Sequence, residues 1–329
     1  MLDQAFSAQN FRRIYDRENR RGRNVDARFF PDLVIASATI SAASAKLRDF
    51  RRTNAQLAKA DLIEAAAPLR ASLDTARGAR DDLVDAAMQN VSDEATAKAF
   101  QLSLAPTNGP KNTPIYPLTN DAPSFFVGKQ LQHNLSRLYK IKQGDRRRII
   151  RQVKDLLSTT FDMVVVRTDI SAFYESIDRS FLLNDIDKDQ LLSLGSKSHI
   201  KCVLMNYAQD SGQHTGIPRG VGISAYLSEL YMRSIDEHIK QLDGITFYAR
   251  YVDDIIAVFS PTAMSDRAGY LGLLASAVGE RGLALNSAKT KAGPPQAGQG
   301  FVFEYLGYEF TYGGGNCELE LSSTKLARY

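Results

Sequence analysis

The chain has 329 residues, of which 44% are hydrophobic, so it can bury one large core or two, and its composition excludes global disorder. Its two cysteines, Cys202 and Cys317, lie far apart without CxxC spacing, which argues against a disulfide scaffold and a zinc site. Residues 1–23 lack an apolar signal segment, and no run of about 18 apolar residues occurs. We therefore expect a cytoplasmic protein that does not enter a membrane.

The first third of the chain has the texture of a helical region. Between residues 32 and 104 apolar residues recur at helical spacing, as at Leu57, Leu62, Ala65, Leu69 and Leu73, which predicts roughly two to four helices. Two interpretations of the arginines between residues 12 and 23 stay open: contact with RNA, or a solvated helix paired with Asp16 and Glu18. Prolines at 106, 110, 114, 117 and 123 then indicate a surface connector.

A basic segment follows the connector. The net charge of +4 is small, but residues 129–154 hold one acid, Asp145, against nine basic residues: Lys129, Arg137, Lys140, Lys142, Arg146, Arg147, Arg148, Arg151 and Lys154. Helical spacing of apolar residues underlies this segment between Phe125 and Leu157. It suits a polyanionic partner, although a solvated basic helix face has the same pattern.

Three later features carry candidate chemistry. The β-branched run at residues 163–166 predicts a buried strand that ends near Asp169, whose carboxylate can bind a metal or cap the next helix. A glycine-rich turn at residues 215–224 then opens a helix, and such turns let a backbone approach an anionic partner closely. Finally, two apolar runs flank Tyr251-Val252-Asp253-Asp254, which predicts a hairpin presenting two adjacent carboxylates. Such carboxylates repel each other unless hard cations such as Mg²⁺ lie between them.

The order of these features resembles a reverse transcriptase over about residues 125 to 312. The corresponding motifs, A to E, are Asp169 with Phe173, Tyr174 and Ile177; Gly216-Ile217-Pro218-Arg219-Gly220 with Ser224; Tyr251-Val252-Asp253-Asp254; Leu285-Asn286 with Lys289-Thr290; and Tyr305-Leu306-Gly307-Tyr308. The wording of the first motif resembles the bacterial lineage of retrons, abortive-infection proteins and defence-associated reverse transcriptases.

The resemblance implies an α+β fold: the fingers and palm of a right-hand polymerase, with a ferredoxin-like antiparallel palm sheet and helices. We expect a helical N-terminal region over residues 1–104, a proline-rich connector over 105–124, a fingers segment over 125–160, a palm with interspersed fingers elements over 161–312, and the start of a thumb or a tail over 313–329. The thumb is expected to be absent or truncated, because the chain printed here stops soon after the fifth motif.

The resemblance also implies site residues. Two Mg²⁺ ions, with Mn²⁺ as an alternative, would be bound by Asp169, Asp253, Asp254 and the carbonyl group of Ile170, while Lys289 would steady or protonate the pyrophosphate. Tyr174, beside Phe173, would exclude a 2′-hydroxyl group. Arg146, Arg147, Arg148, Arg219 and Gly220 would contact the nucleotide. Tyr251, Gly216, Pro218, Leu306 and Gly307 would contact primer or template.

One departure from the family pattern concerns template handling. The second motif usually reads Pro-Gln-Gly but here reads Pro218-Arg219-Gly220. A guanidinium group in place of an amide changes what this position can bind, because it adds charge and removes the acceptor.

The implied function is that of an RNA-directed DNA polymerase acting in bacterial antiphage defence. Its partners would be an RNA template, specifically a dedicated non-coding RNA, a DNA primer or product, and dNTPs. The thumb's grip would come from the helical N-terminal region, a second copy of the chain, a partner subunit or a structured RNA, and the sequence leaves these open. Three alternatives stay open: template-independent or protein-primed DNA synthesis, RNA-dependent RNA synthesis, and a catalytically silent nucleic-acid-binding module.

Overall fold

The computed structural model describes residues 2–140, 144–261, 269–293, 300–313 and 315–327. Lys142, a member of the basic segment, lies outside these ranges. The chain forms two compact units: unit 1 comprises residues 1–105, 118–134 and 193–203, and unit 2 comprises residues 106–117, 135–192 and 204–329. Two helices, α6 (Ala122–Tyr139) and α10 (Leu194–Ser211), cross the limits of these units.

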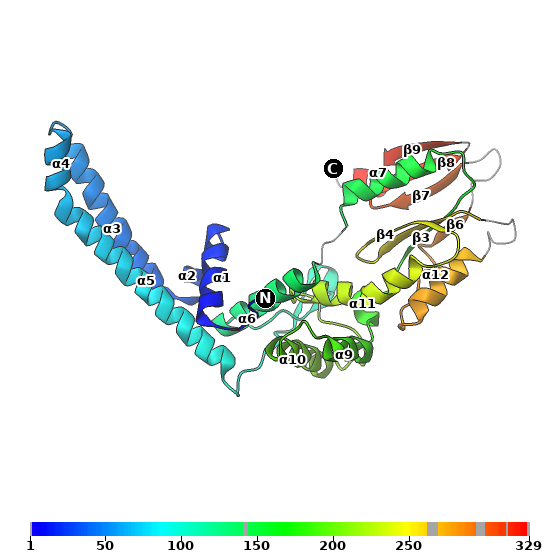
Figure 1. The fold of residues 1–329 in the computed structure, drawn as a ribbon, viewed down its shortest axis with the longest axis horizontal. Helices are drawn as coiled ribbons and strands as arrows, with labels where there is room; N and C mark the ends of the chain where they lie inside the picture. Colours follow the sequence, from blue (N-terminus) through cyan, green and yellow to red (C-terminus); the bar gives the residue numbers. More distant parts are fainter. Residues whose placement is uncertain (1, 141–143, 262–268, 294–299, 314, 328–329) are drawn as a thin grey trace. The chain divides into compact units, whose positions relative to one another are not determined.

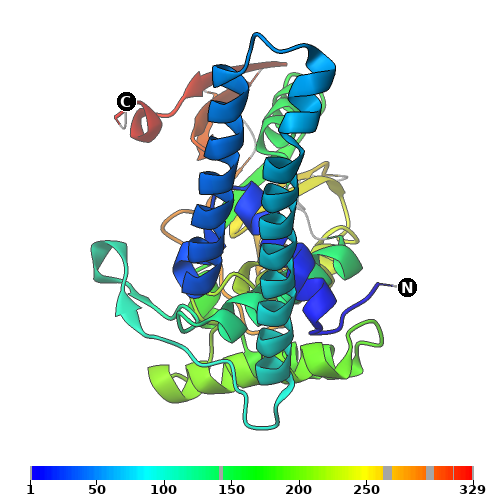
Figure 2. The same ribbon diagram turned by 90° about the vertical axis from the view of Figure 1, so that its left-hand side faces the viewer.

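Unit 1 is built on helices, as the apolar spacing predicts. They are α1 (Ala8–Arg20), α2 (Val25–Phe29), α3 (Pro31–Thr53), α4 (Lys59–Ala65) and α5 (Ala67–Thr96). Proline in the first turn suits the start of α3 and of α5, because no hydrogen-bond donor is lost there. The long helices α3 and α5 run antiparallel, with α4 at the end where they join (Figures 1 and 2). Leu47 and Leu73 are buried between them.

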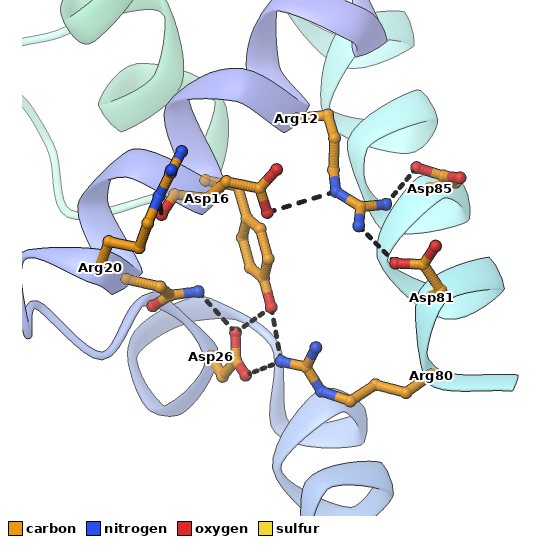
Figure 3. A network of polar contacts seen from close by, with 9 residues as sticks. Arg12, Asp16, Arg20, Asp26, Arg80, Asp81 and Asp85 are labelled. Carbon is orange, nitrogen blue, oxygen red and sulfur yellow. Dashed lines mark hydrogen bonds and ion pairs between the residues drawn. The ribbon is translucent and has the colours of Figure 1, made fainter. Parts of the chain in front are cut away.

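A polar network ties α1 to α2 and α5 (Figure 3). The guanidinium group of Arg12 forms ion pairs with Asp81 and Asp85 on α5. That of Arg80, on α5, binds the carboxylate of Asp26 at 2.6 Å, and the hydroxyl group of Tyr15 donates to the same carboxylate at 2.5 Å. The network engages one of the N-terminal arginines in ion pairs inside unit 1, which favours the paired-helix interpretation for that residue.

A second group of these arginines surrounds Glu18, whose side chain is fully buried. The carboxylate of Glu18 lies 2.8 Å from the guanidinium group of Arg23, and 3.3 Å from the ammonium group of Lys129. Arg21 and Arg17 pair with it at 3.3 Å and 3.5 Å. Lys129, the first residue of the basic segment, is therefore engaged within the protein.

Unit 2 is centred on a four-stranded antiparallel sheet. Its strands are β3 (Val164–Asp169), β4 (Ile245–Tyr251), β5 (Asp254–Phe259) and β6 (Lys291–Gly293), in the order β4-β5-β3-β6. Because both faces of β3 are covered, its first three residues are all valines and all buried. Helix α12 (Tyr270–Gly279) packs on β3 and on α11 (Ser224–Ile239), which also contacts α9 (Arg179–Lys188).

A three-stranded antiparallel sheet shares the core of unit 2. It consists of β7 (Phe301–Tyr305), β8 (Tyr308–Gly313) and β9 (Asn316–Leu321). Aromatic residues of β7 and β8, such as Phe303 and Phe310, pack with Val165 and Ile256 of the first sheet and with the apolar face of α7 (Arg146–Leu157). Strand β9, which lies in the segment predicted as thumb or tail, completes this sheet by pairing with β8.

The remaining elements of unit 2 are short. They are β1 (Thr107–Asn108), the 3-10 helix at Pro110–Asn112, β2 (Pro114–Ile115), α8 (Phe173–Ser176) and α13 (Ser323–Leu326). Strands β1 and β2 pair with each other inside the proline-rich connector. The α+β fold with antiparallel sheets and N-terminal helices is confirmed. Across the described ranges, the structure contains no helix with the length and apolar character needed to span a membrane.

Candidate active site

A cleft of about 1030 Å³ in unit 2 gathers eight of the seventeen predicted site residues. It is lined by Arg146, Arg167, Asp169, Tyr251, Val252, Asp253, Asp254, Lys289, Glu304, Leu306, Gly307, Ser322 and Lys325. The motifs at residues 169, 251–254, 289 and 306–307 therefore open onto one space.

Strand register brings the acidic residues together. Asp169 is the last residue of β3 and is paired directly with Asp254, the first residue of β5, which in turn is paired with Tyr251 at the end of β4. Asp253 lies in the connecting turn, and its carbonyl oxygen accepts a hydrogen bond from the amide of Ile170 at 3.1 Å. The three carboxylates thus come from one edge of the sheet, where the backbone of Ile170 is fixed.

Two cations engage these carboxylates. The ammonium group of Lys289 lies 2.9 Å from Oδ2 of Asp169, and Nη2 of Arg167 lies 3.0 Å from Oδ1 of Asp254. The side-chain amide of Asn286 reaches Oδ1 of Asp169 at 3.4 Å. Among the residues that the structure describes, no three carboxylate, imidazole or thiol groups come close enough together to hold a metal ion.

Electrostatics disfavour ionisation of two of the carboxyl groups. Burial raises the pKa of Asp253, and the negative charge of Asp169 raises it further, against the opposing effect of Lys289 and Arg219. Burial likewise raises the pKa of Asp254; Arg167 lowers it, and the other two carboxylates raise it. Burial and mutual repulsion thus outweigh the nearby cations at Asp253 and Asp254, although the four acidic residues of the lining are matched by four basic ones.

The turn that carries Asp253 has an unusual backbone. Val252 has a φ of +60°, which is rare for a β-branched residue and matches the first loop position of a type II′ hairpin turn. Arg250 supports this conformation, because its Nη1 donates a hydrogen bond to the carbonyl oxygen of Val252 at 2.7 Å. The guanidinium group of Arg250 is itself held by Glu229 at 2.8 Å and Asp236 at 2.7 Å, both on α11.

The glycine-rich turn packs against the segment after β3. The amide of Gly216 donates to the carbonyl of Ile177 at 2.7 Å, and that of Ile217 to the carbonyl of Tyr174 at 2.9 Å. Gly216 has a φ of +90°, and a Cβ atom there would lie 3.0 Å from the backbone of Glu175, so only glycine fits.

None of the predicted residues of this turn, Gly216 included, belongs to the cleft lining. Pro218 is buried, and its carbonyl accepts a 2.6 Å hydrogen bond from the Ser224 hydroxyl. Gly220 has a φ of +94° and lies close to Pro117.

Arg219, the departure from the family pattern, forms a two-point ion pair. Its Nε and Nη2 donate to the two carboxylate oxygens of Glu175 at 2.5 Å and 3.0 Å. The same guanidinium group lies 5.4 Å from the centre of the Tyr174 ring. Tyr174 is half-buried and contacts the buried ring of Phe173 edge-on. Burial raises the pKa of Glu175, but Arg219 outweighs this effect and the pKa is lowered.

The structure separates the three consecutive arginines of α7. Arg146 lines the cleft and donates from Nη2 to the carbonyl of Leu306 in the β7–β8 turn. Arg147 and Arg148 are exposed and outside the cleft lining, and their amides donate to the carboxylate of the capping residue Asp145. In the β7–β8 turn, Leu306 and Gly307 both have positive φ, as a type I′ turn requires.

Sequence reasoning missed several residues of the site. Arg167 precedes Asp169 by two positions, so strand alternation places the two side chains on the same face and could have found it. Arg250 directly precedes Tyr251 on β4, and its hydrogen bond to the carbonyl group of Val252 supports the turn that carries Asp253. Glu304 and Lys325 line the cleft without a local pattern that marks them.

A family comparison identifies this arrangement. The model of the family described as reverse transcriptase (RNA-dependent DNA polymerase) matches residues 116–310, more than half of the chain. The chain belongs to the reverse transcriptase family. No curated protein matches the sequence.

Solved structures similar to this reverse transcriptase include telomerases of two Candida species. Apo telomerase from Candida tropicalis truncated from its C-terminal domain is 15% identical, with a TM-score of 0.44, over 68% of this chain and 54% of that chain. Telomerase from Candida albicans in complex with a TWJ fragment of telomeric RNA is 12% identical, with a TM-score of 0.44, over 70% and 46%. The present chain thus spans about half the length of these proteins.

Proposed function

We propose that this reverse transcriptase is an active RNA-directed DNA polymerase that adds dNTPs to the 3′ end of a primer. The observation that carries the proposal is the pairing of Asp169 with Asp254 across β3 and β5, with Asp253 in the adjoining turn, inside one large cleft. Neighbouring carboxylates of this kind would bind the divalent cations that bring a triphosphate and a primer 3′ end together.

Carboxylate oxygens are the donor type that Mg²⁺, or Mn²⁺ as an alternative, prefers, and the three carboxylates would have to move closer together to hold such an ion. Hard divalent cations bind carboxylate oxygens, and the pKa values of Asp253 and Asp254 are raised first by burial and then by neighbouring carboxylates, whose negative charge such ions would neutralise. Asp169, Asp253, Asp254 and the carbonyl group of Ile170 would hold two ions. When bound, these ions would lower the pKa of the primer hydroxyl group and stabilise charge on the phosphates.

Residues of the cleft would handle the rest of the nucleotide. Lys289 and Arg146 line the cleft and carry the positive charge that a triphosphate or its leaving pyrophosphate would meet. Tyr251, Leu306 and Gly307 line the same space and would contact the primer end. Arg147, Arg148 and Gly220 are exposed outside the cleft lining, so their predicted roles would require contact with nucleic acid outside the cleft. Gly216 and Pro218 are buried, so they would act by shaping the turn.

The test is incorporation of labelled dNTPs by the full chain with Mg²⁺ and primed RNA. Asp253→Asn should lower incorporation at least about a thousandfold, because it removes charge at the reacting phosphate. Glu309→Gln is the matched control: it makes the same change on β8 outside the cleft lining and should retain activity. Equal incorporation by wild type and Asp253→Asn would contradict the proposal and leave the silent binding module as the interpretation.

One observation favours a second candidate, template-independent synthesis. The Arg219 guanidinium group is held by Glu175, where the family usually has an amide. Sequencing the product distinguishes the candidates: a copy of the supplied RNA supports templated synthesis, whereas a sequence unrelated to that RNA supports the second candidate. DNA attached to the protein would indicate protein priming, and incorporation of rNTPs alone would indicate an RNA polymerase.

Tyr174 is proposed to select deoxynucleotides. Its ring is held between Phe173 and the guanidinium group of Arg219, which would keep it in place against a 2′-hydroxyl group. Tyr174→Ala should raise rNTP use relative to dNTP use about tenfold or more, since one steric exclusion of about 1.4 kcal/mol has that effect. Tyr174→Phe is the control and should keep the wild-type ratio; an unchanged ratio in Tyr174→Ala would refute the gate.

We further propose a role in bacterial antiphage defence with a dedicated non-coding RNA in the cytoplasm. The support is the wording of residues 169–178, which resembles the defence-associated lineage. Sequencing the RNA that copurifies with the protein, and challenging cells that carry wild type or Asp253→Asn with phage, test this role. A random mixture of copurified RNAs, or equal survival of both strains, would remove it.

A further inference from the structure

The α3–α5 hairpin of unit 1 has two ends of different charge character. Toward the start of α3 and the end of α5, acidic residues such as Asp81 and Asp85 meet the guanidinium group of Arg12 (Figure 3). Toward α4, arginines predominate on both helices. The ion pairs that hold α1 to α5 therefore belong to one end of the hairpin, and they leave the arginines of the other end to be explained.

Arginines line a groove of about 340 Å³ at this second end. We call it the arginine groove, and its four arginines are Arg48 and Arg51 of α3 and Arg70 and Arg77 of α5. Asp74 is the one acidic residue of its lining, and it pairs with Arg77 at 3.3 Å. Within the described residues, Arg48, Arg51 and Arg70 form no ion pair. The groove thus holds positive charge that the fold itself leaves unbalanced.

The positions of these arginines favour an extended anion. On α5, Arg70 and Arg77 are two helical turns apart, which is about 10 Å along the axis, and Arg48 and Arg51 are one turn apart on α3. A row of guanidinium groups of this length matches successive phosphates of a nucleic-acid strand better than a single phosphate. Each planar guanidinium group can also donate two parallel hydrogen bonds to one phosphate.

The groove offers charge with little apolar surface. Leu47 and Leu73, its two leucines, are only 7% and 5% exposed. A protein partner is anchored mainly by side chains that fill apolar pockets, which these buried leucines do not provide. Phosphodiester binding requires only the exposed cations.

We propose that the arginine groove binds the phosphate backbone of RNA. The description of the family to which the chain belongs names RNA as the nucleic acid on which its DNA synthesis depends. The proposal is separate from catalysis, because the groove lies in unit 1 and the carboxylate cleft in unit 2. An RNA bound here would be held whether or not nucleotides are added.

The test compares two double variants of the full chain in binding to a fluorescently labelled single-stranded RNA, between about 50 and 200 mM salt. Arg48→Gln/Arg70→Gln should weaken binding about tenfold, and the slope of log affinity against log salt should fall by about 1.4, since each lost phosphate contact removes about 0.7. Lys46→Gln/Arg52→Gln removes the same charge from exposed positions of α3 outside the groove lining and should leave the slope unchanged. Circular dichroism checks that both variants keep their helices.

Photocrosslinking of the same RNA to the full chain locates the contact. Crosslinks within residues 44–77 are expected, and their loss in Arg48→Gln/Arg70→Gln would support the groove. Equal weakening by the two double variants, or crosslinks confined to unit 2, would overturn the proposal. Displacement of the RNA by poly-glutamate of equal charge would overturn it too, because the groove would then accept any polyanion. No nucleotide is added in these assays, so their failure leaves the polymerase proposal untouched.

Discussion

Two carboxylates, the buried Glu18 in unit 1 and the partly buried Asp254 in unit 2, have pKa values shifted in opposite directions. For Glu18, burial raises the pKa, but Lys129, Arg23 and Arg17 outweigh this effect and the pKa is lowered. For Asp254, burial raises the pKa, and two neighbouring carboxylates leave the lowering effect of Arg167 insufficient. The difference shows that the charges around a buried acid, rather than its burial, decide whether it stabilises the fold.

The same difference separates structural charge from charge available to a ligand. Around Glu18 the cations come from α1, its following loop and α6, so the carboxylate helps to hold these segments together. Around Asp254 the neighbours are other acids on adjoining positions of one sheet edge. In unit 1 the ion pairs of Glu18 hold segments together, whereas in the cleft three neighbouring carboxylates keep like charges close to one another, and an added cation would relieve their repulsion.

The largest effect is expected from Glu18→Gln. It removes the negative charge from a group of cations and leaves the partly buried Lys129 without a counter-ion, which should lower the free energy of unfolding by about 2 to 3 kcal/mol. Denaturant unfolding of the full chain measures this loss. Asp16→Asn, a carboxylate-to-amide change at an exposed position of the same helix, should cost less than about 1 kcal/mol. Equal losses in the two variants would erase the contrast between the two carboxylates.

A smaller effect of opposite sign is expected from Asp254→Asn. A carboxyl group with a raised pKa destabilises the fold above its unfolded value of about 3.9, so its removal should stabilise unit 2 at neutral pH, by about 1 kcal/mol or less. This gain should vanish as the pH falls, because the wild-type carboxyl group then binds a proton. Denaturant unfolding at a series of pH values measures it, and a gain that grows toward acid would contradict the assignment.

As the pH falls, the free energy of unfolding of Glu18→Gln should also approach the wild-type value, but starting from a lower stability. The lowered pKa of Glu18 gives stability that is present above the unfolded value of about 4.3 and is lost as the pH falls through the folded value. In the same pH series, Glu18→Gln should therefore start less stable than the wild type and Asp254→Asn more stable, and both differences should shrink toward acid.

Local sequence patterns predict the parts of the molecule that depend on neighbours in the chain. The valines of β3, the apolar spacing of α3 and α5, and the two apolar runs around Val252 and Asp253 each indicate their element. Motif order then predicts that Asp169 meets Asp254. The element predictions follow from periodicity, and the predicted meeting of the two carboxylates follows from the family resemblance.

Local sequence patterns do not predict contacts between segments that are distant in the chain. The pairing of Arg219 with Glu175 depends on how two turns pack, and the selection of Arg146 over Arg147 and Arg148 depends on where α7 begins relative to the β7–β8 turn. The pairing of β9 with β8 is not predicted either, because Asn316–Leu321 falls in the segment predicted as the start of a thumb or a tail. The short β1–β2 pair was missed because prolines dominate its sequence.

The central position of β3 has a consequence for synthesis of the protein. Both of its neighbours, β5 and β6, follow it in the chain, so β3 leaves the ribosome several seconds before either partner at roughly 5 to 20 residues per second. During that interval the apolar run at Val164, Val165 and Val166 has two open edges, which invites association with other nascent chains. The acidic corner of the cleft forms only once β5 has emerged, so the open strand edges and the incomplete site belong to the same stage of synthesis.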